Sequence, residues 1–286
     1  MTFSVLAWAE DRCSDRCLPS TSATGSSMTF ANQNDGDMGL GIELIEQAHD
    51  IIQAFNCVCE AFGGQVEDGI WIAMNPEWNT QEGKNRGAAR MVDRWRRTTT
   101  DNNGNPNTMF LKATLPDPQE ASKRTIVGLA IWIQASNIQG HGDPQIEVLE
   151  TSSDLKSLYP GNESERRYLS QVMSSLHSRR REVIEEAETS MPPALFALDL
   201  CAVDPAYQGK GIAKRLVQWG LAEALRRGNL EAVTEASSMG RHVYEKMGFK
   251  PEGLDMEYLV DEEFALRQRP ANIFMRTRGS TQTNQI

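Results

Sequence analysis

The chain has 286 residues, a length that allows one large domain or two small ones. Hydrophobic residues make up 40% and charged residues 24%, which excludes wholesale disorder and a fibrous architecture. A formal net charge of −10 makes nucleic acid and anionic membranes poor partners. The longest apolar run, residues 126–133, is too short to span a bilayer. We therefore expect a soluble protein.

The chain begins with a segment, residues 1–38, rich in Ser, Thr, Asp, Asn and Gly, and we expect it to be a disordered lead. Its short apolar stretch follows no basic residue, so we expect no targeting segment. Residues 41–47 alternate like a strand. Apolar residues at helical spacing over 51–62 then predict a helix that ends at Gly63 and Gly64.

An aromatic loop over residues 71–78 and a helix over 83–97 come next. Strands are predicted at 108–115 and 125–135, and the second has the continuous apolar run of a strand buried on both faces.

An insertion over residues 136–193 follows, with a long helix predicted over 163–188. The charged runs RRRE and EEAE within this helix are typical of a solvated face.

Helices and strands alternate from residue 195 onward, which predicts an α/β or mixed α+β fold. The predicted strands are 195–203, 231–235, 254–260 and 272–276, and the predicted helices are 211–227 and 238–247. We expect the tail, residues 279–286, to be disordered.

The cysteine content favours a reducing, cytoplasmic compartment. Five cysteines leave at least one unpaired, and their spacing is not that of a disulfide framework; they are Cys13, Cys17, Cys57, Cys59 and Cys201. The pair Cys13 and Cys17 has no second pair of ligands, so we expect no metal.

A glycine-containing loop between a strand and a helix is the sharpest feature of the sequence. It reads Gln208, Gly209, Lys210, Gly211, Ile212 and Ala213. Glycines allow a tight turn that gathers several N–H groups, and the helix N-terminus adds partial positive charge, so the loop can cradle an anion. The segment 204–250 holds eight basic and five acidic residues, which favours a phosphate-bearing ligand. The alternative is an ordinary tight turn with surface lysines.

The chain resembles the GNAT superfamily of N-acetyltransferases at two places. Q-x-x-G-x-A at 208–213, after a strand ending in V-D-P, is similar to the family's acetyl-CoA pyrophosphate loop. The segment GRHVYEKMGF at 240–249 is similar to the second family signature. The resemblance implies a mixed, mostly antiparallel sheet, splayed at the cofactor strand and flanked by helices, in one domain over residues 39–278.

The resemblance also implies the site residues. Backbone N–H groups of residues 208–213 would hold the pyrophosphate of acetyl-CoA, with no metal. Pantetheine would lie along Leu200, Cys201, Ala202 and Val203. Tyr244 would protonate the departing thiolate. The alternative for Tyr244 is a helix residue with its hydroxyl at the surface.

Asp199 is a charged residue within an apolar strand, and by alternation it shares a face with Cys201 and Val203. It would serve as a general base, as an anchor for the substrate amine, or as a hydrogen-bond partner of a neighbouring loop. A backbone N–H near Cys201 or Ala202 would stabilise the tetrahedral intermediate. We expect the Cys201 side chain to act as a small buried hydrophobe and not as a nucleophile, because no histidine lies near it in sequence.

The expected function is direct transfer of an acetyl group from acetyl-CoA to a primary amine, through a ternary complex. A small-molecule acceptor is favoured, with Trp71, Trp78 and Trp132 as candidate lining of its pocket. One alternative is a protein lysine or N-terminal acetyltransferase, and another is a non-catalytic CoA-binding protein of the same fold. We expect a monomer or homodimer that binds neither nucleic acid nor membrane.

Overall fold

The computed structural model describes residues 39–278, apart from residues 118, 121 and 145–152. These described residues belong to one compact unit. The expected disordered lead and tail, with Cys13 and Cys17, lie outside the described residues.

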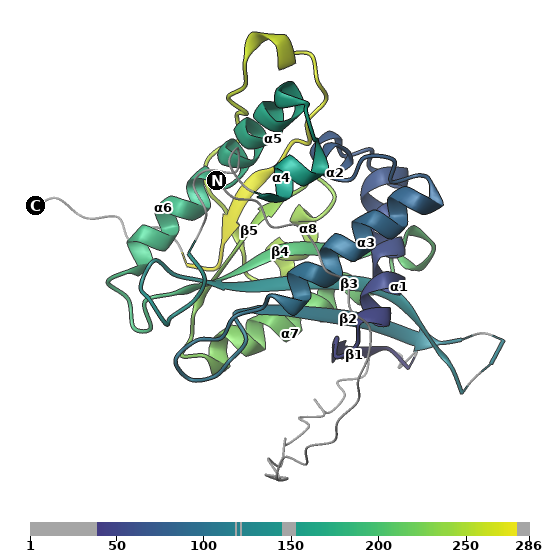
Figure 1. The fold of residues 1–286 in the computed structure, drawn as a ribbon. Coiled ribbons are helices and arrows are strands. Elements are labelled where there is room, and N and C mark those ends of the chain that lie inside the picture. Colours follow the sequence, from purple (N-terminus) through teal and green to yellow (C-terminus); the bar gives the residue numbers. More distant parts are fainter. Residues whose placement is uncertain (1–38, 118, 121, 145–152, 279–286) are drawn as a thin grey trace, which may run out of the picture. The chain divides into compact units, whose positions relative to one another are not determined.

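One seven-stranded sheet organises the unit, in the order β1-β2-β3-β4-β5-β7-β6 (Figure 1). Among the described strands, only β4 and β5 pair in parallel. The strands are β1 (Gly41–Leu44), β2 (Thr108–Pro116), β3 (Arg124–Ala135), β4 (Leu195–Val203), β5 (Glu231–Ala236), β6 (Lys250–Pro251) and β7 (Ile273–Arg276). The expected mixed, mostly antiparallel sheet flanked by helices is confirmed.

Helices cover both faces of this sheet (Figure 1). The described α-helices are α1 (Ala48–Val58), α2 (Gly69–Met74), α3 (Gln81–Arg96), α4 (Ser153–Leu158), α5 (Glu163–Leu176), α6 (Ser178–Ala187), α7 (Ile212–Arg226) and α8 (Arg241–Lys246). Apolar residues of α1, α3 and α6 pack on one face, while those of α7 and α8 pack on the other. A smaller cluster joins α2 and α5 to Phe264.

Two predictions near the N-terminal helix are wrong. The helix does not end at Gly63, because a π-helical segment, Cys59–Gln65, continues it. Gly63 serves close packing instead of a stop, since a Cβ there would lie 2.5 Å from the Trp78 ring. Part of the expected aromatic loop is the helix α2, whose first N–H groups are capped by the Asp68 carboxylate.

The expected helix over residues 163–188 is two helices, because α5 ends at Leu176 and α6 begins at Ser178, with His177 between them. The charged run RRRE is not wholly a solvated face, since Arg180 is only 1% exposed. The cause is its position on the same stripe as Val183, Ile184 and Ala187, which face the core.

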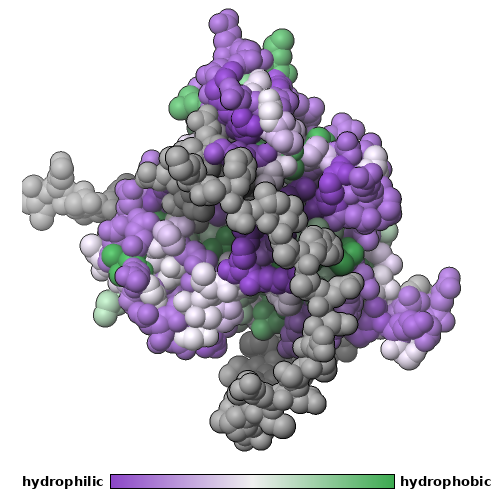
Figure 2. Space-filling view, in the orientation of Figure 1, coloured by the Kyte–Doolittle hydropathy of each residue, from purple (hydrophilic) through white to green (hydrophobic). Residues whose placement is uncertain are grey.

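The strand predicted over residues 254–260 is also wrong. This segment has no strand pairing, and it leaves Leu254 and Leu259 exposed by 89% and 72%. It passes over α5, where the Leu259 and Asp261 N–H groups donate to side chains of that helix (Figure 1). The face drawn in Figure 2 is mostly hydrophilic, with small, separate apolar spots.

Candidate active site

The strands β4 and β5 diverge partway along their length and form a fork. They pair only from Leu195 opposite Glu231 to Leu198 opposite Thr234. Beyond this point, β4 remains paired with β3 alone. Because the Asp204 N–H donates to the Val127 oxygen, strand alternation directs the main-chain groups of residues 201 and 203 toward the open side. The fork therefore offers a free backbone edge where the resemblance places pantetheine.

The loop after β4 presents backbone N–H groups at the start of α7. Gly209 and Gly211 have φ of +75° and +76°, and a Cβ on either would meet no atom within 4 Å. Within the described part of the chain, no protein acceptor binds the N–H groups of Gly209, Lys210 and Gly211. The first-turn N–H groups of α7, including those of Ile212 and Ala213, are free by helix geometry. This arrangement can hold an anion.

Side chains of the same loop bind the protein and leave the backbone available. Gln208 donates from Nε2 to the Val203 oxygen at 3.1 Å and to Gln65 Oε1 at 2.8 Å. The Lys210 Nζ lies 5.0 Å from the centre of the Tyr207 ring. Ile212 is buried in the core beneath the loop. These side-chain contacts with the protein fix the shape of the loop, while the space next to Gly209 and Gly211 is open.

A β-bulge at Asp199 changes which residues share a face. Ile131 pairs with Leu200 and Trp132 with Leu198, so Asp199 is an extra residue without a partner on β3. The prediction that Asp199 faces the same side as Cys201 is therefore wrong. Asp199 contacts Arg94 of α3 and Arg180 of α6, whereas Cys201 and Val203 pack on the side of α7 and α8, and Leu200 and Ala202 pack opposite them.

Two guanidinium groups hold the Asp199 carboxylate. Arg94 Nη2 donates to Oδ2 at 2.7 Å, and Arg180 Nη1 donates to Oδ1 at 3.0 Å. Burial alone would raise the pKa of Asp199, but the charges of Arg94 and Arg180 outweigh it and hold this pKa well below its usual range. So acidic a carboxyl group is a weak base at neutral pH. The geometry therefore favours a hydrogen-bonding role for Asp199 over that of a general base, with two helix residues as its partners instead of the expected loop.

Tyr244 of α8 is buried, with 8% of its surface exposed, and it belongs to the same cluster as Cys201. Burial raises the pKa of Tyr244 well above its usual value, and the neighbouring Cys201 adds to this effect. The phenol therefore stays protonated and can donate a proton at the fork. Burial also raises the pKa of the Cys201 thiol to about 12, which disfavours Cys201 as a nucleophile.

The sequence did not predict the charged residues on the α3–α6 side of the fork, opposite Tyr244. Arg180 binds both Asp199 and Glu235, through Nη1 and through Nε at 2.9 Å respectively. Its place on the apolar stripe of α6 was the signal that could have revealed its burial. Next to it, burial and the charge of Arg180 lower the pKa of His177 to about 4, so this imidazole is neutral at neutral pH.

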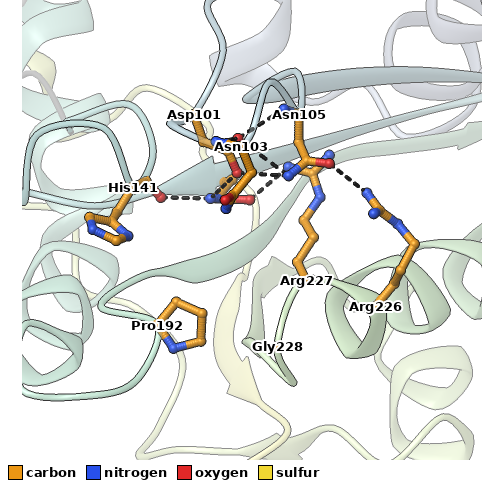
Figure 3. A pocket seen from close by; sticks show the side chains of 9 residues that line it. Asp101, Asn103, Asn105, His141, Pro192, Arg226, Arg227 and Gly228 are labelled. Atoms are coloured by element: carbon orange, nitrogen blue, oxygen red, sulfur yellow. Dashed lines mark hydrogen bonds between the residues drawn. The ribbon is translucent and has the colours of Figure 1, made fainter. Parts of the chain in front are cut away.

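The polar pocket in Figure 3 lies at the C-terminal end of α7, the opposite end of this helix from the glycine loop. Its volume is about 420 Å³. The Asp101 carboxylate accepts from the N–H groups of Asn103 and Asn105, and Arg227 donates to Gln134 at 2.6 Å (Figure 3). Because these groups satisfy one another, we interpret the pocket as the network that fixes the 101–107 loop.

The tryptophans proposed for the acceptor pocket separate into two groups. Trp71 and Trp78 pack edge to face with ring centres 6.0 Å apart, on the α1–α3 side of the sheet. Trp132 is fully buried and stacks on Phe196 on the opposite side, so it serves the core.

No group of three or more His, Cys, Asp or Glu side chains in the described part of the chain could hold a metal ion. None of the helices described here has the length and apolar character needed to cross a membrane.

A sequence model of the acetyltransferase (GNAT) domain matches residues 181–251. No protein of curated function matches the chain.

Among solved structures, the apo form of an agmatine N-acetyltransferase variant has 11% identity and a TM-score of 0.52. The Drosophila melanogaster polyamine N-acetyltransferase has 11% identity and a TM-score of 0.51. Arylalkylamine N-acetyltransferase 2 from Aedes aegypti has 18% identity and a TM-score of 0.50. Each similarity covers 83% of this chain and 97% of the other, and at such identities it shows the shared fold. With the domain match over residues 181–251, it shows that the chain is similar to acetyltransferases of the GNAT superfamily and shares their fold.

Proposed function

We propose that this protein transfers an acetyl group from acetyl-CoA to the primary amine of a small molecule, in a domain spanning residues 39–278. The observation that carries the proposal is the juxtaposition of three features. They are the open N–H groups at Gly209 and Gly211, the free edge of β4 beyond Leu198, and the buried phenol of Tyr244.

The residues present fit acetyl-CoA. The backbone N–H groups of residues 209–213 would bind the pyrophosphate, because they converge at a helix N-terminus and have open space above two glycines. Along β4 from Leu200 to Val203, the main-chain groups of Cys201 and the N–H of Val203 face the open side and would pair with the amide groups of pantetheine. Gln208 would shape the loop, since its side chain binds Gln65 and Val203 and its N–H donates to the Pro205 oxygen.

The proposed reaction needs no covalent enzyme intermediate. The amine nitrogen attacks the thioester carbonyl and forms the C–N bond, and the C–S bond breaks when the resulting tetrahedral intermediate collapses. The Cys201 N–H, on the open side of β4, would stabilise charge on the carbonyl oxygen. Tyr244 would donate its proton to the departing thiolate. Holding both substrates in this geometry supplies much of the acceleration.

The proton released by the attacking amine would pass to water in this scheme. Asp199 is held as a carboxylate by Arg94 and Arg180, so we assign it the role of an anchor for these two side chains. Because Tyr244 and Asp199 belong to opposite faces of the sheet, the amine would approach from the α3–α6 side.

The proposal also specifies a small molecule as the acceptor. It is supported by a fold shared with proteins described as agmatine, polyamine and arylalkylamine N-acetyltransferases. Action in the cytoplasm, by a monomer or homodimer, belongs to the same proposal.

The deciding experiment is an acetylation screen of small amines and lysine peptides with acetyl-CoA, read by mass spectrometry beside calorimetric CoA binding. Acetylated small amines would support the proposal. Acetylation confined to peptides would favour a protein acetyltransferase. CoA binding without any product would favour a non-catalytic CoA-binding protein.

A further inference from the structure

Arg180 is the most deeply buried charged side chain near the fork, and it comes from the insertion. Only 1% of the residue is exposed. Its guanidinium donates to the Glu235 carboxylate through Nε and Nη2, and to Asp199 Oδ1 through Nη1 at 3.0 Å. We name Arg180, Asp199 and Glu235 the fork clamp, because they connect α6 of the insertion with both diverging strands.

The fork clamp lies at the point where the two strands part. Leu198 opposite Thr234 is their last pair, and the next residues along each strand are Asp199 and Glu235. The guanidinium of Arg180 thus joins the strands directly beyond the end of the β-ladder. On the other side of Asp199, Arg94 of α3 occupies the second carboxylate oxygen at 2.7 Å.

A guanidinium suits this place for a geometric reason. Its planar fork of donors fixes the relative position of two carboxylates, whereas an ammonium group is a single point charge on a flexible stem. Burying three charges gives little net stability compared with apolar packing, so stability alone does not account for the arrangement. The Thr234 hydroxyl, which donates to the Leu198 oxygen at 3.0 Å, further fixes the start of the fork.

We propose that Arg180 is a positioning residue for acetyl transfer, which holds the fork between β4 and β5 at the opening that aligns the thioester with the amine. The inference rests on the proposed function. It also makes the insertion part of the catalytic architecture, because α6 supplies the side chain that sets the opening.

The test compares Arg180→Lys with a matched control, Arg276→Lys. Arg276 is also buried, 4% exposed, and it also links α6 to β5, through Glu186 at 3.0 Å and Glu231 at 2.6 Å. Glu231, however, pairs with Leu195 at the far end of β5. The control therefore loses a buried arginine of the same kind away from the fork.

For Arg180→Lys we expect kcat to fall by about 10- to 100-fold with the acetyl-CoA KM within about threefold, because a small misplacement affects reactivity more than binding. Amide hydrogen exchange should quicken at residues 199–201 and 234–236. Arg276→Lys should lower Tm while its kcat per folded molecule and exchange at the fork stay normal. An unchanged kcat in folded Arg180→Lys, or an equal loss in the control, would overturn the proposal.

Two further arms keep the test decisive. If Arg180→Lys does not fold, the combination of Arg180→Met, Asp199→Asn and Glu235→Gln removes the three charges of the fork clamp together and leaves only the partly exposed Arg94 without its partner. The same kcat loss is expected. If the wild-type protein acetylates none of the amines or peptides, the proposed function fails. Hydrogen exchange at residues 199–201 and 234–236 then still decides whether Arg180 holds the two strands together.

Discussion

Asp199 determines how the two faces of the fork differ. As the extra residue of a bulge, it moves one position of β4 onto the face of Arg94 and Arg180. Cys201 then falls on the opposite face, beside Tyr244. One inserted residue thus separates the ion-paired side of the fork from the side that holds the proton donor.

The first prediction concerns the proposed pyrophosphate cradle. Gly211→Val should raise the acetyl-CoA KM about tenfold or more, because its side chain would fill the open space above the loop. Gly104→Val is the matched control, since Gly104 has a similar φ of +79° and equally open surroundings in the 101–107 loop. The control should show the same backbone strain and a normal KM. Equal acetyl-CoA KM values for the two variants would contradict the proposal that the cofactor binds at this loop.

The second prediction concerns Tyr244. Tyr244→Phe keeps the ring and removes the proton, so kcat should fall by about 10²-fold while CoA affinity, measured by calorimetry, stays the same. Because the pKa of Tyr244 lies well above its usual value, the wild-type kcat profile should show no limb from this group below about pH 10. A loss of only a few-fold would leave Tyr244 as a positioning residue.

The third prediction concerns the pH dependence of the Asp199 ion pairs. The folded pKa of Asp199 is below the unfolded value of about 3.9, so the stabilisation is complete above that value and is lost only as the pH falls through the folded pKa. Asp199→Asn should lower the free energy of unfolding by about 3 kcal/mol in urea at pH 7. The same difference at pH 5 is expected. A much smaller difference at pH 5 would mean that Asp199 titrates near there, as a general base would.

At the scale of elements, the approach of α7 to β3 depends on one glycine. A Cβ at Gly220 would lie 2.0 Å from Cε2 of the buried Trp132 ring. Gly220→Ala should therefore lower the free energy of unfolding by about 1–3 kcal/mol in urea denaturation. Adding Trp132→Phe should recover part of that loss, because the smaller ring makes room for the methyl group. Additive losses in the double variant would contradict this contact.

Elements with a strong local pattern could be predicted from the sequence. The apolar run predicts the strand at 195–203, and the glycines predict the loop that follows it; the structure has both at these positions. The site beyond the loop could not be predicted in this way. Arg180 lies 19 residues from Asp199 and 55 from Glu235 in sequence, and the bulge that turns Asp199 toward it arises from pairing with β3. Periodicity within one segment does not report such contacts.

The strand wrongly predicted over 254–260 has a similar cause. Its apolar residues suggest a strand, but the chain there follows α5 instead of the sheet. Leu259 and Asp261 donate from their N–H groups to Ser175 and Gln171. Side-chain acceptors on a helix take the place of a β-ladder, and no pattern within the segment indicates that helix.

At the scale of the whole unit, the insertion is joined to the rest of the unit by both apolar packing and ion pairs. Leu169 and Val172 of α5 are fully buried in the cluster that contains Phe264. The next helix, α6, is tied to the fork by Arg180 and to the far end of β5 by Arg276, through the ion pairs described above. Opening the insertion would therefore expose buried apolar surface and leave buried charges unpaired.

The last prediction follows from this arrangement: the insertion and the sheet should unfold as one cooperative unit. Native-state hydrogen exchange in increasing urea measures the opening free energy of individual amides. We expect the amides of Leu169 and Val172 in α5 to converge on the same global free energy as those of Leu216 and Val217 in α7. If the insertion were an independent attachment, its amides would open at lower urea while α7 stayed protected. In that case Arg180 could not keep the opening between β4 and β5 constant, because it would separate from Asp199 and Glu235 each time the insertion opened.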